Sequence, residues 1–144
     1  MQDVEAMKKC LKLAEEAKQA GDNPFGAVIL GEEGELIAKG KNRENTEFDV
    51  TLHAEIDAIR KASRKLKTND LRGLTIYTNG EPCLMCSVAI RRVGLSRVVY
   101  GAPSANPAQV SPHPLSDPDM GEFPPPAVES ELLGEESRRV QGRC

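Results

Sequence analysis

Two cysteines three residues apart, Cys83 and Cys86, follow a proline in the segment GEPCLMC. Residues spaced i and i+3 lie on one face of a helix, so both sulfurs can reach the same metal ion. A helix N-terminus also favours the thiolate form that binds metal. His53 begins a second helical pattern, HAEIDAIRKASRKL, and an imidazole is a common metal ligand. These residue types and spacings predict a centre with one nitrogen and two sulfur ligands.

Two other uses of a Cys-x-x-Cys pair have to be weighed against this prediction. A pair at the start of a helix is also typical of a redox dithiol, and a structural zinc site would use one as well. Structural zinc sites usually have four protein ligands. The remaining cysteines, Cys10 and Cys144, and the remaining histidine, His113, belong to no paired motif. Three good ligands without an obvious fourth favour an open, catalytic site.

An acidic residue, Glu55, lies two positions after His53. The order His-x-Glu and then Pro-Cys-x-x-Cys is typical of zinc deaminases. Zinc lowers the pKa of a bound water from about 15.7 to around 7, and the resulting hydroxide can attack a ring carbon that bears an amino group. Glu55 would take the proton of that water and deliver it to the ring nitrogen and then to the departing amine. Taken alone, Glu55 would be an acidic residue that is favourable in the first turn of a helix.

The elements that position these residues can be predicted from hydrophobic spacing. Helical spacing occurs over residues 2–20, 53–66 and 83–94. Short apolar runs bounded by turn residues predict strands over 24–30, 35–42, 74–79 and 96–102. The order α-β-β-α-β-α-β predicts an α/β fold, in which helices flank a mixed sheet.

The composition changes after Ala102. Residues 103–126 hold eight of the ten prolines, which predicts an irregular, extended segment. The following stretch, AVESELLGEESRRV, predicts a short acidic helix that is interrupted or ends near Gly134. We therefore expect a core over 1–102 and a C-terminal segment over 103–144 that belongs to the same domain.

Length and charge narrow the class of protein. A chain of 144 residues is the usual size of one domain, and its net charge of −3 gives no overall electrostatic reason to bind nucleic acid. The sequence contains no apolar run long enough to cross a membrane, and its N-terminus lacks the apolar core of a secretory signal. We expect a cytoplasmic protein with reduced thiols.

The sequence resembles the cytidine and deoxycytidylate deaminase superfamily over most of residues 1–102. The resemblance rests on HAE, EPCLMC, NPFGAVIL, VVYGA and the asparagine of GKN. The chain is most similar to the branch of guanine deaminases, fungal-type cytosine deaminases and tRNA adenosine deaminases, and NPFGAV and YTNGEPCLMC are closest to guanine deaminase. The resemblance implies a three-layer α-β-α fold with a central mixed five-stranded sheet, whose fifth strand has no clear counterpart in this sequence. It also implies a homodimer with active sites near the interface.

The resemblance also implies a role for each matching residue. One zinc ion per chain would be held by His53, Cys83 and Cys86, and Glu55 would be the proton shuttle.

Three further matching residues would form the substrate pocket. Asn42 would hydrogen-bond the base, the backbone N–H of Ala54 would contact it, and Phe25 would line the pocket. Asn42 also follows a predicted strand and could be a turn residue, and Phe25 could belong to the core.

These residues lead to three hypotheses for function. The first is a hydrolase of the C–N bonds of cyclic amidines that deaminates free guanine, cytosine or a nucleoside in purine or pyrimidine salvage. The second is a tRNA adenosine deaminase, which needs a cationic path and stacking groups. The basic run from Arg60 to Lys67 is the only candidate path, and the chain has three Phe, two Tyr and no Trp. The third is a non-catalytic zinc-stabilised module in which a residue such as His113 replaces the water.

The C-terminal third departs from the resemblance. Relatives usually have a fifth strand and terminal helices that supply residues that read the substrate. In this chain the only candidates for that role are four residues that could equally be solvated loop positions: Asp117, Asp119, Glu122 and Phe123. The sequence therefore predicts the chemistry more closely than the substrate.

Overall fold

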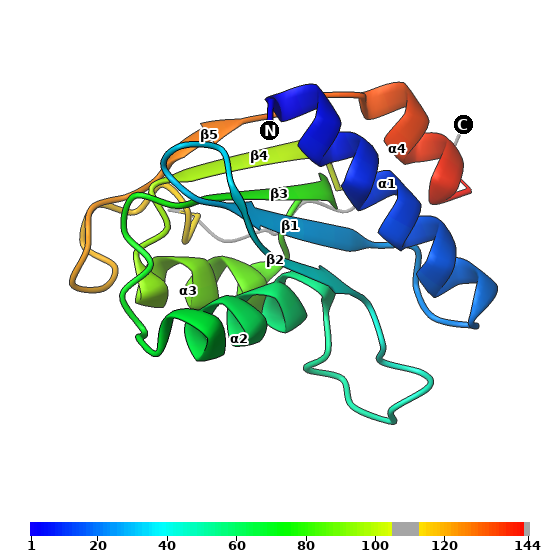
Figure 1. Ribbon diagram of the computed structural model, residues 1–144, viewed down its shortest axis with the longest axis horizontal. Coiled ribbons are helices and arrows are strands. Elements are labelled where there is room, and N and C mark those ends of the chain that lie inside the picture. Colours follow the sequence, from blue (N-terminus) through cyan, green and yellow to red (C-terminus); the bar gives the residue numbers. More distant parts are fainter. Residues whose placement is uncertain (105–112, 143–144) are drawn as a thin grey trace.

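The computed structural model describes residues 1–104 and 113–142. Cys144 and the part of the proline-rich segment over 105–112 lie outside these ranges. A five-stranded sheet lies between two pairs of helices, as Figure 1 shows. None of the helices within the described ranges is long and apolar enough to cross a membrane.

Each face of the sheet is covered by two helices (Figure 1). One face carries α1 (Asp3–Gln19) and α4 (Gly134–Val140), and the other carries α2 (Ala54–Leu66) and α3 (Leu84–Val93). This is the predicted three-layer α-β-α arrangement.

The sheet has the strand order β2-β1-β3-β4-β5. Its strands are β1 (Gly26–Leu30), β2 (Leu36–Lys41), β3 (Thr75–Gly80), β4 (Arg97–Ala102) and β5 (Ala127–Glu129). Strand β1 pairs antiparallel with β2 and β3, whereas β3, β4 and β5 run parallel. The sheet is therefore mixed, as predicted. The carboxyl ends of β3 and β4 reach the same edge, where the chain turns from β3 into α3.

The central strands are buried on both faces because helices cover both sides of the sheet. Successive side chains along a strand point to opposite sides. Ile29 and Val98 belong to the apolar cluster beneath α2 and α3. Their neighbours, Val28 and Val99, belong to the cluster beneath α1. This arrangement explains why the central strands are continuous apolar runs in the sequence.

A close approach between β2 and α2 sets the position of the beginning of that helix. A Cβ atom on Gly40 would lie 2.5 Å from the carbonyl oxygen of Ala54 and 2.5 Å from the amide nitrogen of Ala58. Real Cβ contacts do not come this close, so only glycine lets the helix lie directly against the strand. The first turn of α2, and His53 before it, therefore has a firmly defined place over the sheet.

The predicted end of the third helix is confirmed. Gly94 follows α3 with a φ of 77°, in the left-handed region, and its backbone N–H is bonded to the carbonyls of Ile90 and Arg91. Glycine adopts this conformation at a helix end without a steric penalty.

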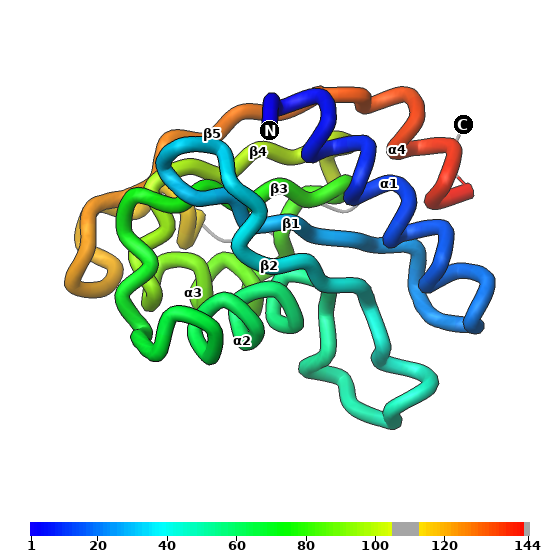
Figure 2. The backbone as a smooth tube through the Cα atoms, in the orientation of Figure 1, coloured from blue at the N-terminus to red at the C-terminus, as the bar shows by residue number. Residues whose placement is uncertain are grey.

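The prediction of a helix over the stretch that begins at Ala127 is wrong in its first part. Ala127–Glu129 forms β5, with Ala127 opposite Arg97 and Glu129 opposite Val99 of β4. The helix begins only at Gly134. Hydrogen bonds to the exposed edge of β4 outweigh the weak helix propensity of this stretch, and the three prolines before it favour an extended chain. The C-terminal part of the chain thus supplies the fifth strand (Figure 2).

A buried arginine holds the irregular segment over 113–123 against α3. The Arg91 Nη1 atom donates to the carbonyls of Pro114 and Asp117, at 2.7 and 2.5 Å. Its Nη2 atom donates to the carbonyls of Met120 and Phe123. A guanidinium group carries five N–H donors, and this geometry lets one side chain satisfy four backbone carbonyls. The segment is therefore irregular but well anchored.

Candidate active site

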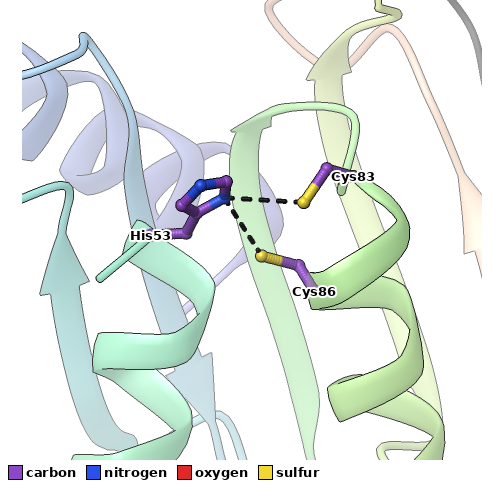
Figure 3. Close-up of side chains that lie close together, drawn as sticks. All are labelled: His53, Cys83 and Cys86. Atoms are coloured by element: carbon purple, nitrogen blue, oxygen red, sulfur yellow. Dashed lines mark hydrogen bonds between the residues drawn. The ribbon is translucent and has the colours of Figure 1, made fainter. Parts of the chain in front are cut away.

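Three predicted ligands converge where α2 and α3 begin (Figure 3). The His53 Nδ1 atom lies 3.5 Å from the Sγ atoms of both Cys83 and Cys86. All three ligand atoms lie within 4.8 Å of one another. His53 immediately precedes α2, Cys83 immediately precedes α3, and Cys86 lies in the first turn of α3. Two helix N-termini thus bring His53 to one point with cysteines that lie 30 and 33 positions further along the chain.

These distances fit a zinc ion. With Zn–N near 2.0 Å and Zn–S near 2.3 Å, the nitrogen-to-sulfur edge of a tetrahedral site is about 3.5 Å. The observed separations of 3.5 Å match that edge. One imidazole and two thiolates are also a donor set that zinc prefers. Among the described residues the group has no fourth member, which leaves one position of a tetrahedral site open.

The two cysteines have different proton affinities. Hydrogen bonds from Cys86 and from His53 lower the pKa of Cys83 to about 4, which favours its thiolate. In contrast, the pKa of Cys86 is raised above the usual thiol range by the hydrogen bond between Cys86 and Cys83 and by the burial of Cys86. The two thiols therefore differ in how readily they lose a proton, and a metal, which binds both as thiolates, would release protons when it binds.

The histidine has charged neighbours on both sides of its ring. Hydrogen bonding to Cys83 raises the pKa of His53. On the other side, the Nε2 atom lies 3.0 Å from the Oε1 atom of Glu44. A carboxylate at this place favours a proton on Nε2 and leaves the lone pair of Nδ1 for a metal.

Glu55 lies beside the donor group but is not part of it. It is the second residue of α2, and only 6% of its surface is exposed. Burial raises the pKa of Glu55 to about 7. A carboxyl group with such a pKa can both accept and donate a proton near neutral pH.

The donor group opens into a cavity of about 200 Å³. The cavity is lined by Phe25, Asn42, Glu44, His53, Glu55, Glu81, Cys83 and Ser104. Cys86 and Ala54 are both buried, and neither is part of this lining. Because Ala54 is the first residue of α2, its backbone N–H has no partner within the helix. Two of the predicted substrate residues, Phe25 and Asn42, thus line the same cavity as Glu55, whereas Ala54 does not line it.

Three residues of the cavity were not predicted from the sequence: Glu44, Glu81 and Ser104. Glu81 precedes the proline of the cysteine motif, and its Oε1 atom accepts the backbone N–H of Ser104 at 2.8 Å. Glu44 stands two positions after Asn42, and that short spacing was the only available signal.

The acidic and aromatic candidates of the C-terminal third lie elsewhere. The ring of Phe123 lies beneath the guanidinium of Arg72, 4.7 Å from ring centroid to the guanidinium carbon. Glu122 lines a different cavity with Arg92. Arg91 holds this segment beside the last turn of α3, while the metal donors are at the first turn. The structure therefore does not bring these candidates into the cavity.

His113 is also outside the donor group. Its Nδ1 atom accepts the backbone N–H of Leu115 at 3.2 Å, and its side chain lines a neighbouring cavity of about 350 Å³. That cavity shares Cys83 and Glu81 with the first one, so the two form adjoining hollows beside the donor group.

A mixed sheet, a histidine and two cysteines at helix N-termini and a buried glutamate beside them define the class of zinc-dependent deaminases. Residues 1–102 match the family described as the cytidine and deoxycytidylate deaminase zinc-binding region. The chain belongs to this family, which confirms the predicted resemblance. Zinc is the metal of this family, and the His53, Cys83 and Cys86 group can hold one ion.

The curated relatives differ in function and in length. The chain is 43% identical over 97 residues to a tRNA(Ile)-lysidine synthase of Deinococcus deserti, a match that covers 67% of this chain but 18% of that protein. It is 31% identical over 140 residues to a probable cytosine deaminase of Schizosaccharomyces pombe, with 96% and 81% covered. It is 41% identical over 104 residues to a guanine deaminase of Bacillus subtilis, with 72% and 66% covered.

Solved structures share the whole fold. A structure from a study of A-to-I editing by tRNA:A34 deaminases has a TM-score of 0.86 and 33% identity, and the match covers 94% of this chain and 98% of that one. A guanine deaminase from Nitrosomonas europaea also has a TM-score of 0.86, with 26% identity and coverage of 98% and 83%. The predicted fold is thereby confirmed.

Proposed function

We propose that the protein is a zinc-dependent hydrolytic deaminase that releases ammonia from a free nucleobase or nucleoside of the guanine or cytosine type. The observation that carries this proposal is the buried Glu55 beside a three-ligand donor group, inside a cavity that also contains Asn42. Such an enzyme would act in the salvage of purines or pyrimidines.

In this proposal, each residue of the metal centre has one task. His53, Cys83 and Cys86 hold the zinc ion, which when bound supplies a Lewis acid that makes hydroxide available at neutral pH. Glu55 accepts the proton of the attacking water, passes it to the ring nitrogen and then delivers a proton to the departing amine. Its burial keeps both protonation states within reach for these transfers.

Three groups bind and orient the base. The side-chain amide of Asn42 offers both a donor and an acceptor, which matches the edge of a nucleobase. The backbone N–H of Ala54 points out of the helix N-terminus and donates to a carbonyl of the ring. Phe25 forms an apolar wall of the cavity.

The charges of the cavity favour a neutral base over a polyanion. Glu44, Glu55 and Glu81 all line it. Carboxylates accept hydrogen bonds from the N–H groups of a base, and they repel phosphates. The exposed basic run of α2 begins at Arg60 and ends at Lys67, so it lies roughly 10–20 Å along the helix axis from His53. These features support a small substrate.

A tRNA adenosine deaminase is the second candidate. The likeness to a structure studied for A-to-I editing by tRNA:A34 deaminases, at a TM-score of 0.86, favours it. The basic run of α2 would then have to contact the backbone of the RNA.

The geometry offers little support for a non-catalytic zinc module. That reading needs a fourth protein ligand, and His113 is not within the donor group. The Nδ1 atom of His113 already accepts a hydrogen bond from the backbone N–H of Leu115.

A substrate screen tests the proposal. We expect the zinc-loaded protein to release ammonia from guanine, from cytosine or from one of their nucleosides, and to leave a tRNA anticodon stem-loop unchanged. Reaction of the stem-loop alone would establish the second candidate instead. If no compound reacts although one zinc is bound per chain, the protein is not a deaminase of this class.

The same proposal includes a homodimer and a single domain. Leu84, Met85 and Val88 form an apolar strip on α3, each with more than a third of its surface exposed, and a second copy of the chain would cover them. Sedimentation equilibrium tests the dimer, and the mass of one chain would contradict it.

The pairing of β5 with β4 supports the view that 103–144 belong to the same domain as 1–102.

A further inference from the structure

We propose that Glu44 is a positioning residue that ties the histidine of the metal centre to the asparagine that binds the substrate. The inference rests on the proposed function for the role of Asn42, but its part that concerns the metal centre stands on the donor group alone. The residue lies in the connection between β2 and α2.

One oxygen atom of Glu44 is the common point. Its Oε1 atom lies 3.0 Å from the Nε2 atom of His53. The same atom accepts a hydrogen bond from the Nδ2 atom of Asn42 at 2.8 Å and one from Asn23 at 3.3 Å. A carboxylate that faces the outer nitrogen of a metal-binding imidazole selects the tautomer and orients the ring. Glu44 therefore prepares His53 to present Nδ1 to the ion.

Glu44 also holds both ends of the Asn42 amide. Its carboxylate binds the amide nitrogen, and its backbone N–H donates to the amide oxygen at 3.0 Å. An asparagine side chain can otherwise turn over and exchange its donor with its acceptor. With both ends bound, Asn42 presents a single pattern of donor and acceptor to the cavity. Each of these amide atoms has the capacity for one further bond, which the base would make.

The connection that carries Glu44 is anchored on both sides of it. On the one side, the side chain of Arg43 pairs with the buried Asp57 of α2 at 2.7 Å. On the other side, the Oδ1 atom of Asp22 accepts the backbone N–H groups of Asn45 and Thr46, each at 2.9 Å. Because the connection is anchored on both sides, the Glu44 carboxylate keeps its position even when neither a metal nor a base is bound. The geometry around His53 is therefore prepared before the metal or the base arrives.

A comparison of three variants tests this role. Glu44→Ala removes the shared oxygen, whereas Glu44→Gln keeps an oxygen that can accept from the same groups. Glu47→Ala is the matched control, because Glu47 lies in the same connection and contacts Arg43 at 3.6 Å on the surface. We expect Glu44→Ala to release zinc to a chelating dye about 10–100 times faster than the wild type, with Glu47→Ala unchanged and Glu44→Gln nearer the wild type.

A spectroscopic measurement separates positioning from a loss of stability. In the cobalt-substituted protein, the visible absorption bands report the geometry of the ligands. We expect these bands to shift in Glu44→Ala and to stay in place in Glu47→Ala. A role in folding alone would lower the unfolding temperature and leave the bands and the rate of zinc release unchanged. That result in a folded Glu44→Ala protein would overturn the inference. Glu44→Leu, which also removes the shared oxygen, takes its place if the alanine variant does not fold.

The substrate side of the inference has its own measurement. With the base that reacts in the substrate screen, we expect zinc-loaded Glu44→Ala to show a higher KM, because the Asn42 amide is no longer held. An unchanged KM would overturn the link to the substrate. If no base reacts, the proposed function fails, whereas zinc release and the cobalt spectrum still decide the link between Glu44 and His53.

Discussion

At the scale of single residues, the site depends on groups whose surroundings change their proton affinity. An exposed glutamate is ionised at neutral pH and seldom carries a proton to give away. Glu55 lies in a closed environment, where burial raises its pKa to about 7. Cys83 is changed in the opposite direction, since hydrogen bonds lower its pKa to about 4. One fold thus prepares a proton carrier and a metal-binding thiolate within the same cavity.

We expect Glu55→Gln and Cys86→Ser to fail in different ways. Glu55→Gln should keep about one zinc per chain and lose turnover by a factor of about 10²–10⁴, because the proton carrier is missing while the ligands remain. Cys86→Ser should lose the zinc itself. Metal analysis of both proteins, together with ammonia release from the base that reacts in the screen, checks this. Turnover close to the wild type in Glu55→Gln would contradict the role assigned to Glu55.

At the scale of elements, two helix N-termini do the positioning. The α2 helix presents His53 and Glu55, and α3 presents Cys83 and Cys86. The relative position of the two helices follows from how each packs on the sheet, and for α2 the critical contact is with Gly40. A shift of one helix would separate the imidazole from the sulfurs without changing any of the ligands.

Gly40→Ala is expected to show this dependence. The new methyl group would meet backbone atoms of α2 at 2.5 Å, so the helix has to move. We expect the free energy of unfolding to fall by about 1–3 kcal/mol, and zinc to bind more weakly. Urea unfolding and a zinc competition assay measure the two effects.

Gly31→Ala is the control for that variant. At Gly31 the three atoms nearest to the added methyl group all belong to the flexible end of the Glu35 side chain, which can move away. The free energy of unfolding and the zinc affinity of Gly31→Ala should stay close to those of the wild type. Equal effects of the two substitutions would show that the contact between Gly40 and α2 does not position the site.

At the scale of the whole molecule, side-chain contacts connect the first helix to the last three strands of the sheet. Arg97 of β4 pairs with Asp3 of α1 at 2.6 Å and with Glu129 of β5 at 2.5 Å. The Tyr77 hydroxyl donates to the same Asp3 carboxylate at 2.5 Å. This network spans residues that are far apart in the sequence, and it ties the helix layer to three strands.

The network makes stability depend on pH. The hydrogen bond from Arg97 lowers the pKa of Asp3 below its ordinary value of 3.8. A carboxyl group whose pKa is lower in the folded state stabilises that state above its ordinary pKa, and the contribution disappears as the pH falls through the lowered value. We expect Asp3→Asn to cost roughly 0.5 kcal/mol at pH 7, because the 41% exposed side chain is screened by water.

The difference between wild type and Asp3→Asn should shrink as the pH is lowered below 3.8. Urea unfolding at pH 7 and at pH 3 measures it, with the exposed Asp119→Asn as the control. A difference that stays constant between these two values would contradict the proposed role of the ion pair.

Much of the fold and of the site could be predicted because the signals are local. Apolar spacing, turn residues and the glycine after α3 determine where most elements begin and end, and the order of those elements predicts a mixed sheet. The types and order of His53, Glu55, Cys83 and Cys86 predicted the chemistry, and their assigned roles remain predictions for the experiments above. Each of these features lies within a short stretch of the chain, so it can be recognised without knowledge of distant contacts.

Only the tertiary structure decided the features that depend on distant partners. Ala127–Glu129 is a strand because the open edge of β4 lies beside it, and nothing within those three residues predicts that edge. Phe123 is far from the cavity because the buried Arg91 holds its carbonyl at the other end of α3. Glu44 faces His53 because Asp22 and Asp57 hold the connection around it. Residue types and periodicity determined the kind of centre that this protein has, whereas contacts between distant segments determined which side chains surround it.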